Sequence, residues 1–171
     1  MSRLSASPQP KLSPEAQTVY DTVTASNSGL PSTFQALYAN PPVGSGLANL
    51  HSAVSESGLE SWVTYTVALT VAHERENQAL WDSIEPLARE AGVSDAVIAG
   101  IAAGTGPRGL LPKEGIWVHF AQEVLRDKMR NSTWQATNHL AGDEGAVALA
   151  FVTCYYDMMA RLNKTIGLET A

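Results

Sequence analysis

Three side chains that could bind or activate a small molecule lie at helical spacing near the middle of the chain. His73, Asn77 and Trp81 follow one another at intervals of four residues, so on one continuous helix they would share a face. Imidazole exchanges protons near neutral pH, an amide donates and accepts hydrogen bonds, and an indole offers an apolar wall. The spacing predicts a pocket wall with His73 as acid or base and with Asn77 and Trp81 binding substrate. The alternative is that residues 74–76 form a solvated turn and that His73 merely lies at its edge.

The other histidines are in less informative positions. His119 lies between Trp117 and Phe120 in an apolar stretch, where a histidine is either part of a site or a core residue with one satisfied hydrogen bond. His51 and His139 are near expected loops or helix ends, which indicates surface roles. No His-x-x-x-His or Glu-x-x-His pattern occurs, so we expect neither a metal ion nor another cofactor.

Two further patterns have ordinary explanations. Cys154 lies on an apolar stretch with no visible activating base, which favours a small buried side chain over a nucleophile. Asp82 and Glu85 are three residues apart and would share a helix face as a carboxylate pair, most simply a solvated one.

Composition limits the possible functions. The chain has 171 residues, of which 44% are apolar and 16% charged, which suits one domain with a substantial core. Its formal net charge of −6 opposes general binding to nucleic acid or to an anionic membrane. No apolar run approaches the roughly 20 residues that span a bilayer, and the single cysteine excludes an internal disulfide. We therefore expect a soluble, cytoplasmic protein that binds neither nucleic acid nor membrane.

The periodicity and the helix-capping residues predict an all-α chain. Residues 1–12 are expected to form a flexible arm, and residues 13–171 one helical domain. Gly58–Ala72 partly alternates, which would also permit a strand, but an isolated strand has no partner. The expected helices start at Ser13 and end before Gly29, and then cover Phe34–Tyr38, Leu47–Val54, Gly58–Ala72, Asn77–Ala91, 95–103, Pro112–Met129, Ser132–His139 and Asp143–Ile166. Loops are expected at Asn40–Gly46 and Gly104–Gly109.

Several short segments, in this order, carry a family resemblance. They are Leu12–Asp21, Thr66–Ala72, Trp81, Pro86–Ser94, Phe120–Leu125 and Tyr155–Asn163. Together they resemble the carboxymuconolactone decarboxylase and alkyl hydroperoxidase D-like superfamily over about residues 12–168. The resemblance implies an antiparallel helical bundle that forms homo-oligomers, from dimers to hexamers. It also implies thiol peroxidase chemistry or decarboxylation of a lactone acid as the known activities.

The chain departs from that family where the chemistry is carried. The peroxidase branch has Cys-x-x-Cys, a His four residues later and a Glu on the preceding helix. The corresponding positions here are Asn77, Leu80, Ile84 and approximately Tyr65. A peroxidatic centre needs a thiolate and a resolving thiol, which neither asparagine nor leucine provides. A related branch that uses a carboxylate and a histidine would need them at Leu80 and Ile84, so that chemistry is also missing.

Two function classes remain after this comparison. The first is a non-redox enzyme, of decarboxylase, isomerase or cyclase type, acting on a small organic acid, lactone or polyketide-like intermediate. Its apolar pocket would hold His73 and Tyr65 as catalytic residues, and substrate would bind through Asn77, Trp81 and His119. The second is a non-catalytic oligomeric binding or scaffold protein that lost the site. Residual peroxidase activity is the least favoured reading.

Overall fold

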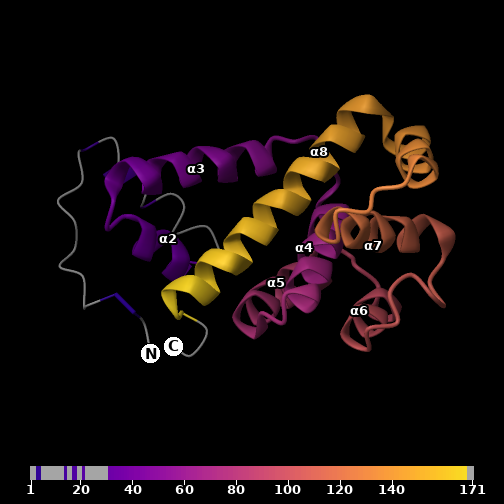
Figure 1. Ribbon diagram of the computed structural model, residues 1–171, viewed down its shortest axis with the longest axis horizontal. Helices are drawn as coiled ribbons and strands as arrows, with labels where there is room; N and C mark the ends of the chain where they lie inside the picture. Colours follow the sequence, from indigo (N-terminus) through magenta and orange to yellow (C-terminus); the bar gives the residue numbers. More distant parts are fainter. Residues whose placement is uncertain (1–2, 5–13, 15–16, 19–20, 22–30, 169–171) are drawn as a thin grey trace.

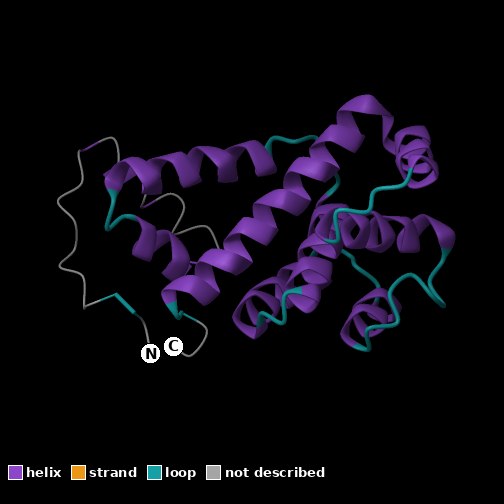
Figure 2. Cartoon of the chain, viewed as in Figure 1, coloured by secondary structure: helices purple, strands orange, loops and turns teal. Residues whose placement is uncertain are grey.

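The structure is a computed structural model, and it describes residues 3–4, 14, 17–18, 21 and 31–168. Within these residues the chain forms helices and connecting loops, with no strand (Figure 2). The all-α prediction is therefore confirmed, and the segment that could also have been a strand is helical from Ser61 on, while residues 58–60 form a loop. The arm at residues 1–12 and the helix expected from Ser13 fall mostly outside the described residues.

Seven helices follow one another in the described part of the chain. They are α2 (Pro31–Leu37), α3 (Pro41–Ser55), α4 (Ser61–Glu74), α5 (Gln78–Glu90), α6 (Asp95–Ala102), α7 (Pro112–Leu125) and α8 (Asn131–Ile166). They occur in the predicted order, and at most boundaries the helix begins or ends within a few residues of the predicted position. None of these described helices is both long enough and apolar enough to cross a membrane.

Helix α4 is the centre of the fold. It contacts α5, α6, α7 and α8, and every residue from 66 to 72 is buried. A helix that is apolar on all sides belongs in the interior, which explains why its sequence lacks the one-sided helical pattern. Its two buried threonines are satisfied within the helix, because Thr66 donates to the Trp62 carbonyl at 2.7 Å and Thr70 to the Thr66 carbonyl at 2.8 Å.

Helix α8 runs across the molecule, with α2 and α3 on one side and α4 to α7 on the other (Figure 1). The helices predicted at Ser132–His139 and Asp143–Ile166 are its two arms, joined at Gly142. The backbone there has φ 71° and ψ 177°, a conformation almost restricted to glycine. The glycine therefore forms a kink at which one helical arm ends and the other begins.

The prediction of a loop at Asn40–Gly46 is wrong, because α3 already begins at Pro41. Proline suits the first turn of a helix, where its missing N–H would be unpaired in any case. Gly44 is then required for packing, since a Cβ there would lie 2.7 Å from the ring of Tyr38. The proline and glycine residues that resemble a loop in the sequence therefore start a helix packed closely against a buried aromatic ring.

Candidate active site

The segment between α4 and α5 is a turn rather than a continuous helix. Glu76 has a positive φ of 50°, and α5 starts only at Gln78. The turn predicted at residues 74–76 is therefore present, and the single helix face on which the three side chains were expected does not exist. His73 ends one helix, Asn77 caps the next, and Trp81 lies one turn into it.

A cleft of about 670 Å³ nevertheless brings His73, Asn77 and Trp81 together. It lies between the end of α4, the first turns of α5 and helix α6, which supplies Ile98 and Ala102. Its volume is in the usual range of small-molecule sites. The arrangement places an imidazole, an amide and an indole around one space.

His73 combines unused hydrogen-bonding capacity with an imidazole ring that can transfer protons. It is half-buried, and its ring makes no hydrogen bond to any residue that the structure describes. Gly104 lies against it, because a Cβ at Gly104 would be 3.3 Å from the His73 Nε2 atom. The glycine at the start of the 104–109 loop therefore leaves room beside the ring nitrogen.

Asn77 lines the same cleft but is committed to the fold. Its Oδ1 atom accepts a hydrogen bond from the Leu80 backbone N–H at 3.0 Å, which caps α5. Its Nδ2 atom donates to the carbonyl of Ala160 on α8, also at 3.0 Å. Asn77 thus joins two helices, and only the remaining capacity of its amide can serve a ligand.

The rim of the cleft is more polar than the apolar pocket expected from the sequence. Trp81 Nε1 donates to Glu85 at 2.8 Å, and Arg89 forms ion pairs with Glu85, at 2.9 Å, and with Asp95 on α6. These bonds lower the pKa of Glu85, first through Arg89 and then through Trp81. Asp82, three residues from Glu85 on α5, is exposed and accepts a hydrogen bond from Gln78 at 2.7 Å.

Tyr65 lies in a different part of the molecule from His73. Eight residues separate them on α4, which corresponds to about 12 Å along the helix axis. Tyr65 lines a smaller cavity with His51 and Tyr156. The structure therefore does not place Tyr65 beside the other predicted site residues.

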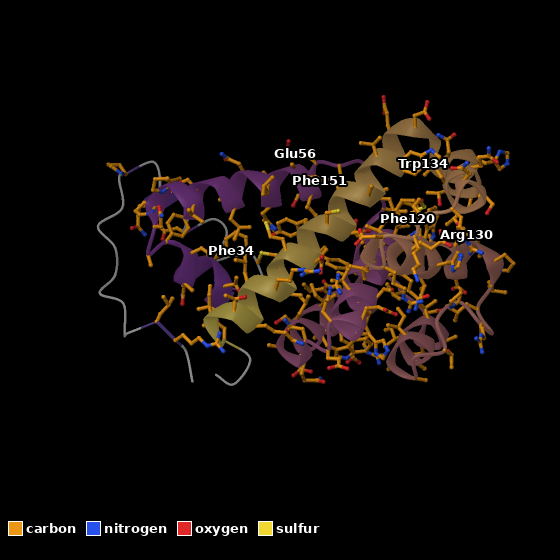
Figure 3. The ribbon with its side chains drawn as sticks, viewed as in Figure 1. Phe34, Glu56, Phe120, Arg130, Trp134 and Phe151 are labelled. Carbon is orange, nitrogen blue, oxygen red and sulfur yellow. The ribbon has the colours of Figure 1, made fainter. Side chains whose placement is uncertain are left out.

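His119 is also outside the cleft, in an ionic cluster that joins α7 to the start of α8. Its Nε2 atom lies 3.0 Å from the Glu123 carboxylate and also contacts the Arg130 guanidinium. Figure 3 shows Arg130 at this end of the fold, near Phe120 and Trp134, whose rings are 6.1 Å apart. The geometry agrees with the reading of His119 as a structural residue with satisfied hydrogen bonds, although it is partly exposed.

The prediction of a surface role for His51 is wrong, because this residue of α3 is half-buried where α3 packs against α8. Its Nδ1 atom lies 3.1 Å from the Tyr155 hydroxyl, and its ring meets the edge of Phe34 at a centroid distance of 5.5 Å. Burial lowers the pKa of His51. The helix period alone did not indicate that α8 covers this face of α3.

This burial predicts a pH-dependent loss of stability. The unfolded chain takes up a proton near pH 6.5, the ordinary histidine pKa, whereas folded His51 resists protonation. The free energy of unfolding should therefore decrease as the pH falls from about 6.5 through the lower pKa of the folded state. We expect His51→Gln to remove this part of the decrease in urea unfolding between about pH 7 and pH 5.5. Parallel pH profiles for the parent and the variant would contradict the assignment.

The prediction that Cys154 is buried is also wrong. The residue is exposed on α8. Partial desolvation of the thiol, with the negative charges of Asp157 and Asp127, raises its pKa. A raised pKa disfavours the thiolate, so the correction in burial does not make Cys154 a nucleophile.

Arg89 and Asp95 line the cleft and Gly104 lies beside His73, although none of the three was expected there from the sequence. A signal existed for the Arg89–Glu85 pair, which has the four-residue spacing of a helical ion pair. No sequence signal connects Asp95 or Gly104 to His73, since only the packing of α6 on α4 brings them there. Within the described residues, no group of three His, Cys, Asp or Glu side chains is placed to hold a metal ion.

Comparisons with models of protein families, with curated proteins and with solved structures gave no match.

Proposed function

We propose that this chain is a divergent carboxymuconolactone decarboxylase-like protein and a non-redox enzyme that moves a proton on a small uncharged lactone or polyketide-like compound. The observation that carries the proposal is that His73 lines the cleft and has no hydrogen-bond partner among the described residues. Of the three half-buried histidines, His51 is bonded to Tyr155 and His119 to Glu123, whereas His73 has no such partner among the described residues and lines the cleft of about 670 Å³. A free imidazole in a partly enclosed site is suited to general acid or base catalysis.

The reaction fits the chemistry of such a residue. A neutral imidazole removes a proton from the carbon next to a carbonyl group, and the resulting imidazolium returns it at another atom. Isomerisation and cyclisation can pass through this proton removal and return, whereas decarboxylation breaks a C–C bond, needs a carboxylate substrate and uses only the proton-donating half. Trp81, Ile98 and Ala102 give the substrate an apolar surface, and the remaining hydrogen-bonding capacity of Asn77 can orient a carbonyl oxygen.

The charge around the cleft favours an uncharged substrate over a free acid. Three carboxylates line it, from Glu76, Glu85 and Asp95, against the single guanidinium of Arg89, which leaves an excess of two negative charges. Arg89 is already paired with two of these carboxylates. An organic anion would therefore meet a negative rim without a free cation.

A non-catalytic binding or scaffold role is the second candidate. It is favoured by the way the other polar groups of the cleft serve the fold: Asn77 caps α5 and holds α8, and Trp81 bonds to Glu85. A panel of lactones and matched open-chain acids, tested by native mass spectrometry and by product analysis, separates the candidates. We expect binding and turnover of a lactone. Binding without turnover would favour the second candidate, and no binding would contradict both.

Thiol peroxidase activity is disfavoured by the geometry around the proposed site. The two positions where the resemblance places thiols are Asn77, a helix cap, and Leu80, a fully buried core residue. Cys154 has a raised pKa and no second cysteine exists in the chain. A disulfide-forming catalytic cycle within one chain is therefore not available.

We further propose that the chain forms homo-oligomers. Val147 on α8 is 62% exposed and Leu140 is 55% exposed. Val147 borders an apolar groove with Ala53 and Phe151, where the end of α3 meets α8, and Figure 3 shows Phe151 beside Glu56 at this place. A contiguous exposed apolar surface favours association.

Light scattering at micromolar concentration is expected to give a mass at least twice the 18.2 kDa of one chain. Val147→Asp should lower that mass, because it introduces a charge into the apolar groove without touching the core. Asp143→Asn, at the polar edge of the same groove, is the matched control and should leave the mass unchanged. A parent protein with the mass of a single chain would contradict the proposal.

A further inference from the structure

A second cavity, of about 180 Å³, lies on the side of α4 that faces α3 and α8. Its polar side chains include His51, Thr64, Tyr65 and Tyr156, and its apolar ones are Val54 and Leu59. It shares no residue with the cleft around His73. The two spaces are therefore separate, and the function of one does not depend on the other.

Two tyrosine hydroxyls at this cavity have no hydrogen-bond partner among the described residues. Tyr156 is only 6% exposed, and yet its hydroxyl bonds to no described group. The half-buried Tyr65 likewise makes no side-chain hydrogen bond to them. Because the polar groups of buried residues nearly always have a partner, the Tyr156 phenol, which opens onto the cavity next to the phenol of half-buried Tyr65, favours an occupant that accepts hydrogen bonds.

His51 adds a third donor to the same wall. Burial raises the pKa of Tyr155, so this hydroxyl keeps its proton and can donate it to the His51 Nδ1 atom at 3.1 Å. With that bond formed, the neutral imidazole carries its own proton on Nε2. The cavity wall then offers donors from Tyr65, Tyr156 and His51, beside the hydroxyls of Ser55, Ser61 and Thr64, which can donate or accept.

The ligand must also be uncharged. None of the side chains that line this cavity in the described part of the chain is a lysine, arginine, aspartate or glutamate. The desolvated histidine favours its neutral form. Burial, and then the negative charge of Glu90, raises the pKa of Tyr65, so the local field also opposes an anion.

We propose that this second cavity binds a small uncharged carbonyl compound, a ketone or lactone, whose oxygen accepts hydrogen bonds from Tyr65 and Tyr156. The volume limits such a compound to roughly six non-hydrogen atoms, at about 30 Å³ for a water-sized group. A carbonyl oxygen has two lone pairs and can accept from both phenols at once. This site is independent of the function proposed for His73.

The test uses γ-butyrolactone as the probe and butyrate as its matched anionic control, since the two have the same number of non-hydrogen atoms. The signals of the histidine rings are followed by NMR in the full chain, with His51 assigned through His51→Gln. We expect the lactone to shift the His51 signal saturably at millimolar concentration. Butyrate should leave that signal in place.

Variants then locate the binding site. Tyr65→Phe and Tyr156→Phe should each weaken lactone binding about 2- to 10-fold, the loss of one neutral hydrogen bond. His73→Ala should leave the His51 response unchanged, which separates this site from the first cleft. If Tyr156→Phe does not fold, Tyr65→Phe decides, because that side chain is half-buried and its hydroxyl bonds to no described residue.

Four results would overturn the proposal. They are the absence of a saturable shift at His51, an equal response to butyrate, unchanged affinity in both phenylalanine variants, and loss of the response in His73→Ala. The last result would assign the signal to the first cleft. Failure of this site alone, with His73 still required for turnover, would leave the function proposed for the first cleft intact.

Discussion

Replacement of His73 by alanine is expected to lower turnover about 10²–10⁴-fold, the usual contribution of a general acid or base. The midpoint of thermal unfolding should stay nearly unchanged. The structure gives the reason, because the imidazole is half-buried and holds no hydrogen bond within the described residues, so its removal leaves no partner unsatisfied. The two quantities are measured on one protein, by product formation from the lactone found in the panel and by circular dichroism.

Two other variants make this measurement specific to the site. His139→Ala removes an exposed histidine outside the cleft and should change neither quantity. Gly104→Ala brings a methyl group to about 3.3 Å from the His73 ring and strains a left-handed position, so activity should fall with some loss of stability. If His73→Ala instead loses 1–3 kcal/mol while the folded fraction stays active, His73 has a structural role. A stable and fully active variant would reject the proposed chemistry.

Local sequence features predicted most of the helices because their signals are local. Ser94 caps α6 as expected, with its hydroxyl accepting from the Val97 N–H at 3.3 Å. The start of α3 could not be predicted in the same way. Its glycine is explained by the ring of Tyr38, which is brought there by α2 packing on α3. Contacts between helices thus decide a boundary that local propensity predicts wrongly.

In the candidate site, too, the local spacing of residues predicted one part of the arrangement, and contacts between helices determine the rest. Four-residue spacing brought His73, Asn77 and Trp81 together in the prediction, and the cleft does contain all three. The three residues do not share one helix face, however, because a turn separates α4 from α5 and the Asn77 side chain caps α5. A residue that caps a helix and a residue on the face of a continuous helix can both lie four residues from their neighbour in the site. The sequence could therefore not distinguish the two arrangements.

Residues on other elements could not be assigned to the site from spacing. Tyr65 was placed there through the family resemblance, and it lines the second cavity instead. His119 is half-exposed because α7 leaves that side to the ionic cluster with Glu123 and Arg130. The burial of His51 depends on α8, which is about 100 residues later in the sequence. Which helix covers which face is decided by packing of the whole chain.

The packing of α7 against the start of α8 also changes the pKa of Glu123. Burial alone would raise the pKa of this carboxyl group, but hydrogen bonds from the Arg130 backbone, Thr133 and the Arg130 guanidinium lower it on balance, with help from His119. The Arg130 backbone N–H donates to Glu123 at 3.0 Å. The carboxylate therefore stabilises the entry into α8, a role that no spacing in the sequence indicates.

Asn77→Ala is expected to give the second large effect, a loss of about 2–4 kcal/mol in the free energy of unfolding. Loss of a helix cap costs about 1 kcal/mol. The remainder, about 1–3 kcal/mol, comes from the Ala160 carbonyl, which loses the hydrogen bond from Asn77 in a region where Asn77 itself is only 1% exposed. The midpoint of thermal unfolding should fall by about 5–15 °C in a domain of this size.

Two matched variants divide the effect of Asn77 into its parts. Asn77→Ser keeps a capping oxygen but cannot reach Ala160, so its free energy of unfolding should lie between those of the parent and the alanine variant. Gln78→Ala, at the next and exposed position, removes a side chain whose one hydrogen bond within the described residues is to Asp82, and should change stability by no more than about 0.5 kcal/mol. Urea unfolding followed by circular dichroism measures all three. An alanine variant within 0.5 kcal/mol of the parent would show that neither bond stabilises the fold, since each is expected to contribute about 1 kcal/mol or more. Equal losses for serine and alanine would instead assign the effect to the bond between α5 and α8.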